Sequence, residues 1–255
     1  MRAGMLRTLE SAAALYKRGF HEEALDTIEN SLAIAPDDGR LWELRGLVLR
    51  ATGNIPLACD SLEHASLLVP LSSGGQVTLA DCLARTGHGS VAVCIAEHIL
   101  SLANVDWSLL LYLAQVCDNC GRPDLSIAIC REVNWQAPDC HQAFYDLGYY
   151  LGRHKQPLAE IEAAARQAIA LAPSIANYRV GLASLLWQQE RRETAFREAD
   201  VLSLAELHSL KCECCLRRLV KIFWQAHAFA KSSACVERLA QLQRDTKSAG
   251  PDCCL

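Results

Sequence analysis

Apolar residues recur along this chain at the spacing of one face of an α-helix, and short turns interrupt the pattern at regular intervals. In residues 41–68 the recurring positions are Leu41, Leu44, Val48, Leu57, Leu62, Ala65 and Leu68. Gly53 divides this run, because glycine adopts at little cost the left-handed conformation that ends a helix. Pro70 ends the second half, because proline cannot continue a helix. The pattern predicts two amphipathic helices joined by a short turn.

The same arrangement returns every 34 residues. Small residues stand at this step at Ala12, Gly46, Ala80, Ala114 and Gly148. Turn glycines follow at Gly19, Gly53, Gly87 and Gly121, and a second set of small residues stands five positions later, at Ala24, Ala58, Ala92 and Ser126. Because a missing side chain lets two helix backbones approach closely, we expect Gly46 to face Ala58 across its hairpin. A fixed period of this length indicates stacked helical repeats.

This pattern resembles that of the tetratricopeptide-repeat (TPR) family, whose 34-residue unit is a helix-turn-helix. The resemblance implies an all-α fold, a right-handed α-solenoid of about six TPR units that ends in a C-terminal pair of capping helices. The expected units are residues 5–38, 39–72, 73–106, 107–140, 141–175 and 176–209, followed by capping helices in 210–245 and a flexible tail in 246–255. The fifth unit has one extra residue in its turn, where Lys155 or Gln156 replaces the glycine.

Composition and charge narrow the choice of partner. Hydrophobic residues make up 51% and charged residues 21% of the 255 positions, and the formal net charge is −4. A chain with a negative net charge has no general attraction for phosphates, so we expect no nucleic acid partner. The apolar run in residues 107–117 is shorter than the roughly 20 residues of a membrane span, and the N-terminus does not resemble a signal peptide. These features predict a cytoplasmic protein with no transmembrane segment.

Motifs of catalysis are missing from the sequence. Residues 87–90, GHGS, lack the third glycine of a dinucleotide fingerprint, and Leu25 stands where the helix of a zinc protease carries its second histidine. A G-x-S-x-G nucleophile elbow is also missing. We therefore predict a protein that is not an enzyme and that uses no cofactor.

Thirteen cysteines are the main sign of other chemistry. Thiolate and imidazole groups are zinc ligands, and they gather at Cys117, Cys120, Cys130, Cys140 and His141. Cys117, however, stands at a repeat position that other copies fill with leucine, so it is expected to pack as a small core residue. The predicted helices would bury further reduced thiols in the same way, at Cys59, Cys94 and Cys130.

A denser group of cysteines lies in the segment KCECC, residues 211–215. Cys212 and Cys215 would share one helix face, with Cys214 on another. Together with Cys253 and Cys254 in the tail they could bind a soft metal ion such as zinc or copper, and the alternative is that they are ordinary thiols. Soft-metal handling is therefore an alternative function.

Stacked helix pairs expose their first helices on one face, which forms a groove for an extended or helical segment. Members of the TPR family usually bind proteins there, so the resemblance implies a non-catalytic scaffold or adaptor with a protein or peptide partner. Tyr145 and Tyr149 are the expected anchors, because aromatic side chains bury a large area at low entropic cost. The predicted partner-binding residues at aligned groove positions are Arg50, Asp81, Arg85, Gln115, Asn119, Tyr145, Tyr149 and Arg153.

A competing hypothesis places the contact at the basic C-terminal end. Residues 209–247 hold eight Lys or Arg against three Asp or Glu. Within residues 216–231 the basic positions alternate with apolar ones, as in a helix that docks on a membrane surface or an acidic partner. A capping helix would show the same pattern, so both interpretations stay open.

Overall fold

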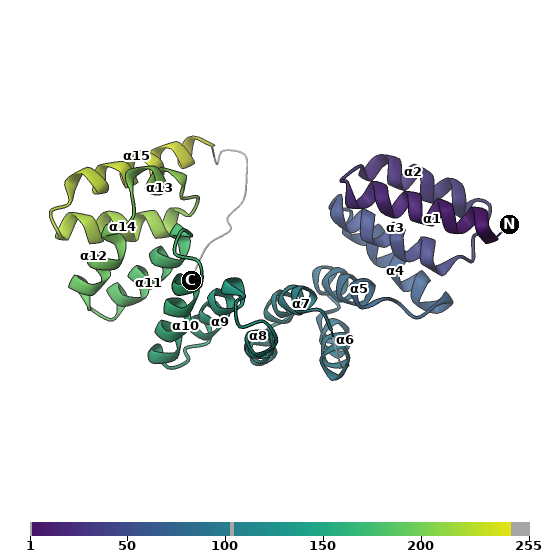
Figure 1. The fold of residues 1–255 in the computed structure, drawn as a ribbon, viewed down its shortest axis with the longest axis horizontal. Helices are drawn as coiled ribbons and strands as arrows, with labels where there is room; N and C mark the ends of the chain where they lie inside the picture. The colour runs from purple at the N-terminus through teal and green to yellow at the C-terminus, as the bar shows by residue number, and fades with distance from the viewer. Residues whose placement is uncertain (1, 103–104, 246–255) are drawn as a thin grey trace. The chain divides into compact units, whose positions relative to one another are not determined.

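The computed structural model describes residues 2–102 and 105–245, and within these ranges the fold is all-α (Figure 1). The residues of the predicted tail, 246–255, lie outside the described residues. Fifteen helices follow one another along the described chain. They are α1 Arg2–Lys17, α2 His21–Leu32, α3 Gly39–Ala51, α4 Ile55–Leu68, α5 Ser73–Arg85, α6 Gly89–Ser101, α7 Trp107–Asn119, α8 Pro123–Gln136, α9 His141–Arg153, α10 Leu158–Leu171, α11 Ala176–Gln188, α12 Arg192–Asp200, α13 Leu204–Ser209, α14 Glu213–Gln225 and α15 Phe229–Asp245.

Consecutive helices pack against each other as hairpins. The pairs α1 with α2, α3 with α4, α5 with α6, α9 with α10, α11 with α12 and α14 with α15 are in extensive contact. In the remaining pair, α7 and α8, the Ser126 hydroxyl donates a 2.8 Å hydrogen bond to the carbonyl of Ala114. The all-α class predicted from the sequence is confirmed.

The small residues of the 34-residue pattern lie at the contact between paired helices. The members of this pattern that are not glycine are all inaccessible to solvent: Ala12, Ala24, Ala58, Ala80, Ala92, Ala114 and Ser126. A Cβ added at Gly46 would lie 2.5 Å from Cγ of Leu62 and 3.1 Å from the carbonyl oxygen of Ala58. The predicted close approach of Gly46 to Ala58 is therefore confirmed, and Leu62 shares the contact.

Each hairpin turns at a residue with a left-handed backbone. In the first four hairpins this residue is Gly19, Gly53, Gly87 or Gly121, with φ between 74° and 90°. The later hairpins place Lys155, Glu190 and His227 there, with φ of 54°, 60° and 57°. The second helix begins two residues after the left-handed residue, except in the fifth hairpin, where α10 begins three residues after Lys155. The extra residue predicted for that turn lies in this gap.

The C-terminal pair of helices, α14 and α15, repeats the geometry of the earlier hairpins. His227 takes the place of the turn glycine, and Ser232 follows five residues later, as Ser126 follows Gly121. The Ser232 hydroxyl donates to the carbonyl of Val220 at 3.4 Å, as Ser126 does to Ala114. The segment expected to cap the stack is thus a seventh hairpin in which no glycine marks the turn.

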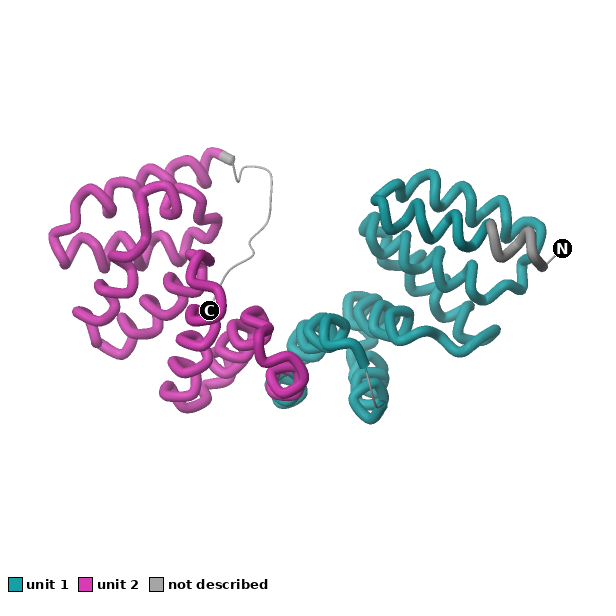
Figure 2. The backbone as a smooth tube through the Cα atoms, viewed as in Figure 1, with its two compact units in different colours: residues 1–129 teal, residues 130–255 magenta. Residues whose placement is uncertain are grey.

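The chain divides into two compact units, residues 1–129 and 130–255 (Figure 2). In unit 1, α3 packs against α5 and α5 against α7, so the first helices of successive hairpins are neighbours. In unit 2, α11 packs against both α10 and α14. The core of unit 2 is centred on fully buried apolar side chains, among them Leu182, Leu186, Leu207, Leu216, Leu219 and Phe223.

Candidate functional site

Three of the predicted partner-binding residues meet in unit 1, on α3 and α5. Asp81 accepts hydrogen bonds from the Nε atoms of both Arg50 and Arg85, and the Arg85 contacts measure 2.9 and 3.0 Å. The Arg85 pair is the i, i+4 pair of one helix, whereas Arg50 comes from the preceding hairpin. The i, i+4 spacing in the sequence could indicate the pair of Asp81 with Arg85. It could not indicate the pair of Asp81 with Arg50.

Asp81 serves as the shared counter-ion of this group. Its side chain is only 2% exposed, whereas that of Arg50 is 25% and that of Arg85 is 45% exposed. Arg50 also donates a 3.0 Å hydrogen bond to the hydroxyl of Tyr112 on α7. Burial, together with the nearby Asp81 carboxylate, raises the pKa of Tyr112. The arginines, and not Asp81, are the members of this group that a partner could reach.

Gln115 and Asn119 lie beyond this group, on α7. Both side chains are exposed. Within the described part of the chain, neither side chain is hydrogen-bonded to Asp81 or its arginines. They share a unit with the cluster but are not part of it.

The other three predicted residues, Tyr145, Tyr149 and Arg153, lie on α9 in unit 2. Tyr145 stacks on Tyr178 of α11, with ring centroids 4.5 Å apart and an interplanar angle of 29°. Tyr149 instead meets Tyr150 edge to face, and the Arg153 guanidinium lies 5.5 Å from the centre of the Tyr149 ring. The two tyrosines expected to act together therefore have different neighbours.

The stacked tyrosines form one wall of a narrow apolar slot in unit 2. Its volume is about 90 Å³. For comparison, a cavity of about 150 Å³ binds benzene, so the slot has room for one aliphatic side chain. Gly148 and Gly152 on α9 and Gly181 on α11 leave space for the slot because they have no side chains. The lining residues are Tyr145, Gly148, Gly152, Ile161, Ala165, Tyr178, Gly181, Leu182, Ser184, Leu185, Gln188 and Arg218.

Hydrogen bonds with polar side chains of α9 hold the hydroxyl of Tyr178 in place. The Tyr178 hydroxyl lies 2.7 Å from Nδ1 of His141 and donates to Oε1 of Gln142 at 3.1 Å. The Gln142 amide in turn donates to Asp146 at 2.7 Å. Burial raises the pKa of Asp146 to about 6, and burial with the nearby Asp146 carboxylate raises that of Tyr178 to about 12. These contacts hold Tyr178 against Tyr145, so the wall of the slot is preformed.

Tyr145 also lines a second, larger cleft of unit 2. This cleft has a volume of about 460 Å³. Its other lining residues come from the turn before α11, from α11 itself, from α13, from the segment between α13 and α14, and from the first turn of α14, and they are Ser174, Ile175, Ala176, Asn177, Val180, Glu206, Ser209, Leu210, Lys211, Cys212 and Cys215.

The sequence analysis did not identify three residues of the slot, Tyr178, Gly181 and Arg218, because the slot joins helices of different hairpins.

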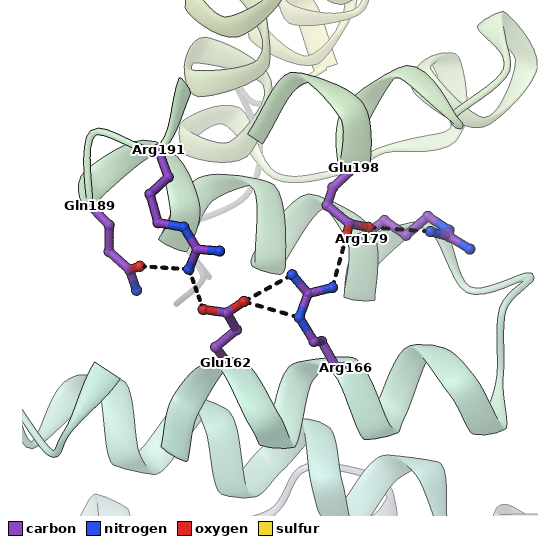
Figure 3. A network of polar contacts seen from close by, with 6 residues as sticks. All are labelled: Glu162, Arg166, Arg179, Gln189, Arg191 and Glu198. Atoms are coloured by element: carbon purple, nitrogen blue, oxygen red, sulfur yellow. Dashed lines mark hydrogen bonds and ion pairs between the residues drawn. The ribbon is translucent and has the colours of Figure 1, made fainter. Parts of the chain in front are cut away.

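Three arginines of unit 2 form a ladder of ion pairs with two glutamates (Figure 3). Glu162 on α10 accepts from Arg191 at 2.5 Å and from Arg166 at 2.8 Å. Arg166 reaches on to Glu198 of α12 at 3.0 Å, and Arg179 of α11 contacts the same carboxylate at 3.4 Å. Burial acts to raise the pKa of Glu162, but the hydrogen bonds from Arg166 and Arg191 hold it below its usual value. This ladder ties successive hairpins together, and its arginines are committed to internal partners.

The eleven described cysteines form no disulfide with one another. Cys59, Cys117 and Cys130 are buried, as predicted. Burial raises the pKa of Cys117 to about 12, which makes this thiol unreactive at neutral pH. The prediction for Cys94 is wrong, because its side chain is exposed.

Among the described residues, a single group of three His, Cys, Asp or Glu side chains has ligand atoms close enough to share a metal ion. It consists of Cys212, Cys214 and Cys215, whose sulfur atoms all lie within 4.8 Å of one another. The residues also considered as zinc ligands do not form such a group: Cys117, Cys120, Cys130, Cys140 and His141. Cys253 and Cys254, which were considered with the first group, lie outside the described residues.

The basic C-terminal helix keeps its apolar face inside unit 2. Leu216, Leu219, Ile222 and Phe223 are at most 1% exposed. Within residues 216–231, Trp224 and Phe229 are the large apolar residues that remain exposed. Their rings meet edge to face. Docking of α14 on a membrane through its buried apolar face would therefore require its core contacts to break. None of the helices, over the ranges described, is both long and apolar enough to cross a membrane.

Neither a protein-family model nor a curated protein matches this sequence. Solved structures do match its fold. The C-terminal part of a TPR repeat-containing protein from Cytophaga hutchinsonii is 14% identical, with a TM-score of 0.68, and the match covers 94% of this chain and 96% of that one. PilF of Pseudomonas aeruginosa is 14% identical with a TM-score of 0.61, over 84% and 94%. YrrB, described as a TPR protein with an unusual peptide-binding site, is 18% identical with a TM-score of 0.55, over 66% and 86%.

These matches and the helix hairpins agree on one architecture. The identities lie below the level at which function can be transferred, so the likeness is one of fold. Helices packed in consecutive pairs are what the matched TPR structures share with this chain. The chain has the tetratricopeptide-repeat fold.

Proposed function

We propose that this protein is a non-catalytic scaffold that binds a segment of a protein partner at unit 2. The TPR fold generally serves protein–protein interaction, and the structure of YrrB is described as having a peptide-binding site. The observation that carries the proposal is the preformed apolar slot beside the Tyr145 and Tyr178 stack. An aromatic wall beside an apolar slot is typical of a site that accepts an anchor side chain.

The bound segment would insert one aliphatic side chain into the slot. The slot volume of about 90 Å³ excludes a large aromatic ring. Arg218 and Gln188 line the same slot, so a carboxylate or carbonyl next to the anchor would find hydrogen-bond donors there. Arg50 and Arg85 of unit 1 would supply a second, separate contact for an acidic residue. The partner is therefore a peptide segment that combines an aliphatic side chain with acidic neighbours.

Selection from a phage-displayed random peptide library against the full chain tests this proposal. Selected peptides should carry the aliphatic and acidic residues and should lose at least about 2 kcal/mol of binding free energy on Tyr145→Ala, as an anchor contact does. Gly152→Leu fills the mouth of the slot from an exposed position and should weaken binding as well.

Tyr149→Ala is the matched control, because Tyr149 lies one turn from Tyr145 on α9 and does not line the slot. Circular dichroism of each variant checks that the helices persist. Peptides that bind Tyr145→Ala and Gly152→Leu as well as the unchanged chain would place the partner site elsewhere, and loss of binding on Tyr149→Ala alone would move it to the Tyr149 and Arg153 side of α9.

A further inference from the structure

The cysteines at the start of α14 are arranged differently from the other described cysteines. Cys212 is the N-cap residue of this helix, and Cys214 and Cys215 lie in its first turn. The sulfur atoms of Cys212 and Cys214 are 3.1 Å apart, and all three sulfur atoms lie within 4.8 Å of one another. Helical geometry alone does not gather three thiols, because successive side chains point in different directions. The N-cap conformation of Cys212 turns its sulfur back over the first turn.

This group is reachable from solvent. Cys212 and Cys214 are half-buried and Cys215 is 8% exposed. Cys212 and Cys215 line the cleft of about 460 Å³, which gives an ion a path to the sulfur atoms. The core thiols differ in this respect, since Cys117 and Cys130 are fully buried. A soft ion in solution can therefore reach this group, whereas it cannot reach the core thiols.

A hydrogen bond from the backbone at the start of α14 reaches the sulfur group. The backbone N–H of Cys215 donates to the sulfur of Cys212 at 3.3 Å. The N-terminal end of a helix carries a partial positive charge, which stabilises anionic groups placed there. Lys211 and Glu206 both line the same cleft, so it presents one cationic and one anionic side chain near the group. Hydrogen bonds to ligand atoms orient them and tune a metal site.

We propose that Cys212, Cys214 and Cys215 form a three-thiolate site for a soft d10 cation, with Cu(I) as its best-fitting ion. Thiolates select copper(I) and zinc over hard cations. Metal–sulfur bonds of about 2.3 Å require sulfur atoms about 4 Å apart around a three-coordinate ion. The sulfur atoms of Cys212 and Cys214 are 3.1 Å apart and none of the three separations exceeds 4.8 Å, so small side-chain rotations would reach this geometry. Zinc would need a fourth ligand to complete its tetrahedron, whereas Cu(I) is satisfied by three. Binding would release the thiol protons to solvent.

Anaerobic titration with Cu(I) against a chromogenic Cu(I) chelator tests the site. The full chain, kept reduced by a phosphine, should bind one Cu(I) in competition with the chelator. Loss of an outer-shell partner alone costs a metal site about 10- to 100-fold in affinity, so Cys214→Ser and Cys212→Ser, which each remove a ligand, should weaken binding by at least about 100-fold. Cys212→Ser keeps a good N-cap residue and so preserves the helix start.

Cys94→Ser is the matched control, because Cys94 is an exposed cysteine of unit 1. It should leave the Cu(I) affinity unchanged, and X-ray absorption of the loaded chain should show three sulfur neighbours. Equal binding by the Cys212→Ser and Cys214→Ser variants and the unchanged chain would overturn the proposal. So would binding that depends only on Cys253 and Cys254, measured with both changed to serine. Peptide binding at the slot is measured separately, so failure of one proposal does not decide the other.

Discussion

Gly46 and Gly148 hold the same position in the 34-residue pattern, yet their surroundings differ. A Cβ at Gly46 would meet Leu62 at 2.5 Å, whereas a Cβ at Gly148 would meet its nearest neighbours, in Ile161 and Ala164, at 3.7 Å. The first distance is a clash with a fully buried side chain, and the second is ordinary van der Waals contact. The sequence pattern treats the two glycines as equivalent, but the packing does not.

The two glycines should therefore respond in opposite ways to the same substitution. Gly46→Ala should lower the free energy of unfolding by about 1 to 3 kcal/mol through overpacking. Gly148→Ala should raise it by up to about 1 kcal/mol, because alanine is the better helix former and fits the space. Urea denaturation of the two variants measures both effects, and a loss of equal size at the two sites would show that the hairpins pack alike.

Asp146 predicts a dependence of stability on pH. Burial raises its pKa to about 6 in the folded protein, against about 3.9 in an unfolded chain. Between these values the folded state binds more protons than the unfolded state, so the free energy of unfolding falls as pH rises from about 4 to about 6. Asp146→Asn should remove this fall and stabilise the protein at pH 7 by about 1 to 2 kcal/mol.

Denaturant unfolding of Asp146→Asn and the unchanged chain at pH 4, 5, 6 and 7 measures this difference. Asp139→Asn, which alters an exposed aspartate in the turn before α9, is the control and should follow the unchanged chain. If Asp146→Asn shows the same fall between pH 4 and pH 6 as the unchanged chain, Asp146 is not its source.

At the scale of the helices, the turns of the later hairpins carry a backbone cost that the earlier ones avoid. Glu190 has a φ of 60° where the first four hairpins use glycine. This conformation costs a residue with a Cβ roughly 1 to 2 kcal/mol. The fold holds these turns through the packing of their helices, since the turn residues themselves are exposed.

Glu190→Gly should therefore stabilise the protein, by about 0.5 to 1 kcal/mol after the larger entropy of glycine in the unfolded chain is counted. Glu193→Gly removes the same side chain from the first turn of α12 and should cost up to about 1 kcal/mol instead. Thermal unfolding of the two variants shows the opposite signs. Destabilisation by Glu190→Gly would mean that its side chain makes a contact worth more than the backbone strain.

For the whole molecule, coupling between parts is limited because each hairpin contacts chiefly its neighbours. Asp81 joins three first helices of unit 1 through Arg50, Arg85 and Tyr112. Its loss should therefore act on α3, α5 and α7 and should leave the hairpins of unit 2 unchanged.

Asp81→Asn should lower the free energy of unfolding of unit 1 by about 2 kcal/mol, less than for a fully buried pair because both arginines keep some hydration. Hydrogen exchange measured by mass spectrometry should show faster exchange in α3, α5 and α7. Glu97→Gln, at an exposed ion pair with Arg122, is the control and should change little. Faster exchange in α11 and α14 as well would show coupling across the whole chain.

The sequence by itself determined the helices, their pairing and the TPR fold, because a 34-residue step of small residues and turn glycines is a local signal. It predicted the C-terminal pair of helices but not that this pair repeats the geometry of the earlier hairpins, since His227 stands in place of glycine and Ser232 in place of alanine. It also misplaced Cys94, which lies on the face of α6 opposite the buried Ala92, Ala96 and Ile99.

Only the tertiary structure decided which candidate residues meet. The stack of Tyr145 on Tyr178, the pairing of Asp81 with Arg50, and the cleft that reaches Cys212 all join different hairpins. Periodicity assigns a residue to a helix face, but the contact it makes depends on how far one hairpin is shifted and rotated against the next. That placement arises from the summed packing of whole helices, which no single stretch of sequence encodes.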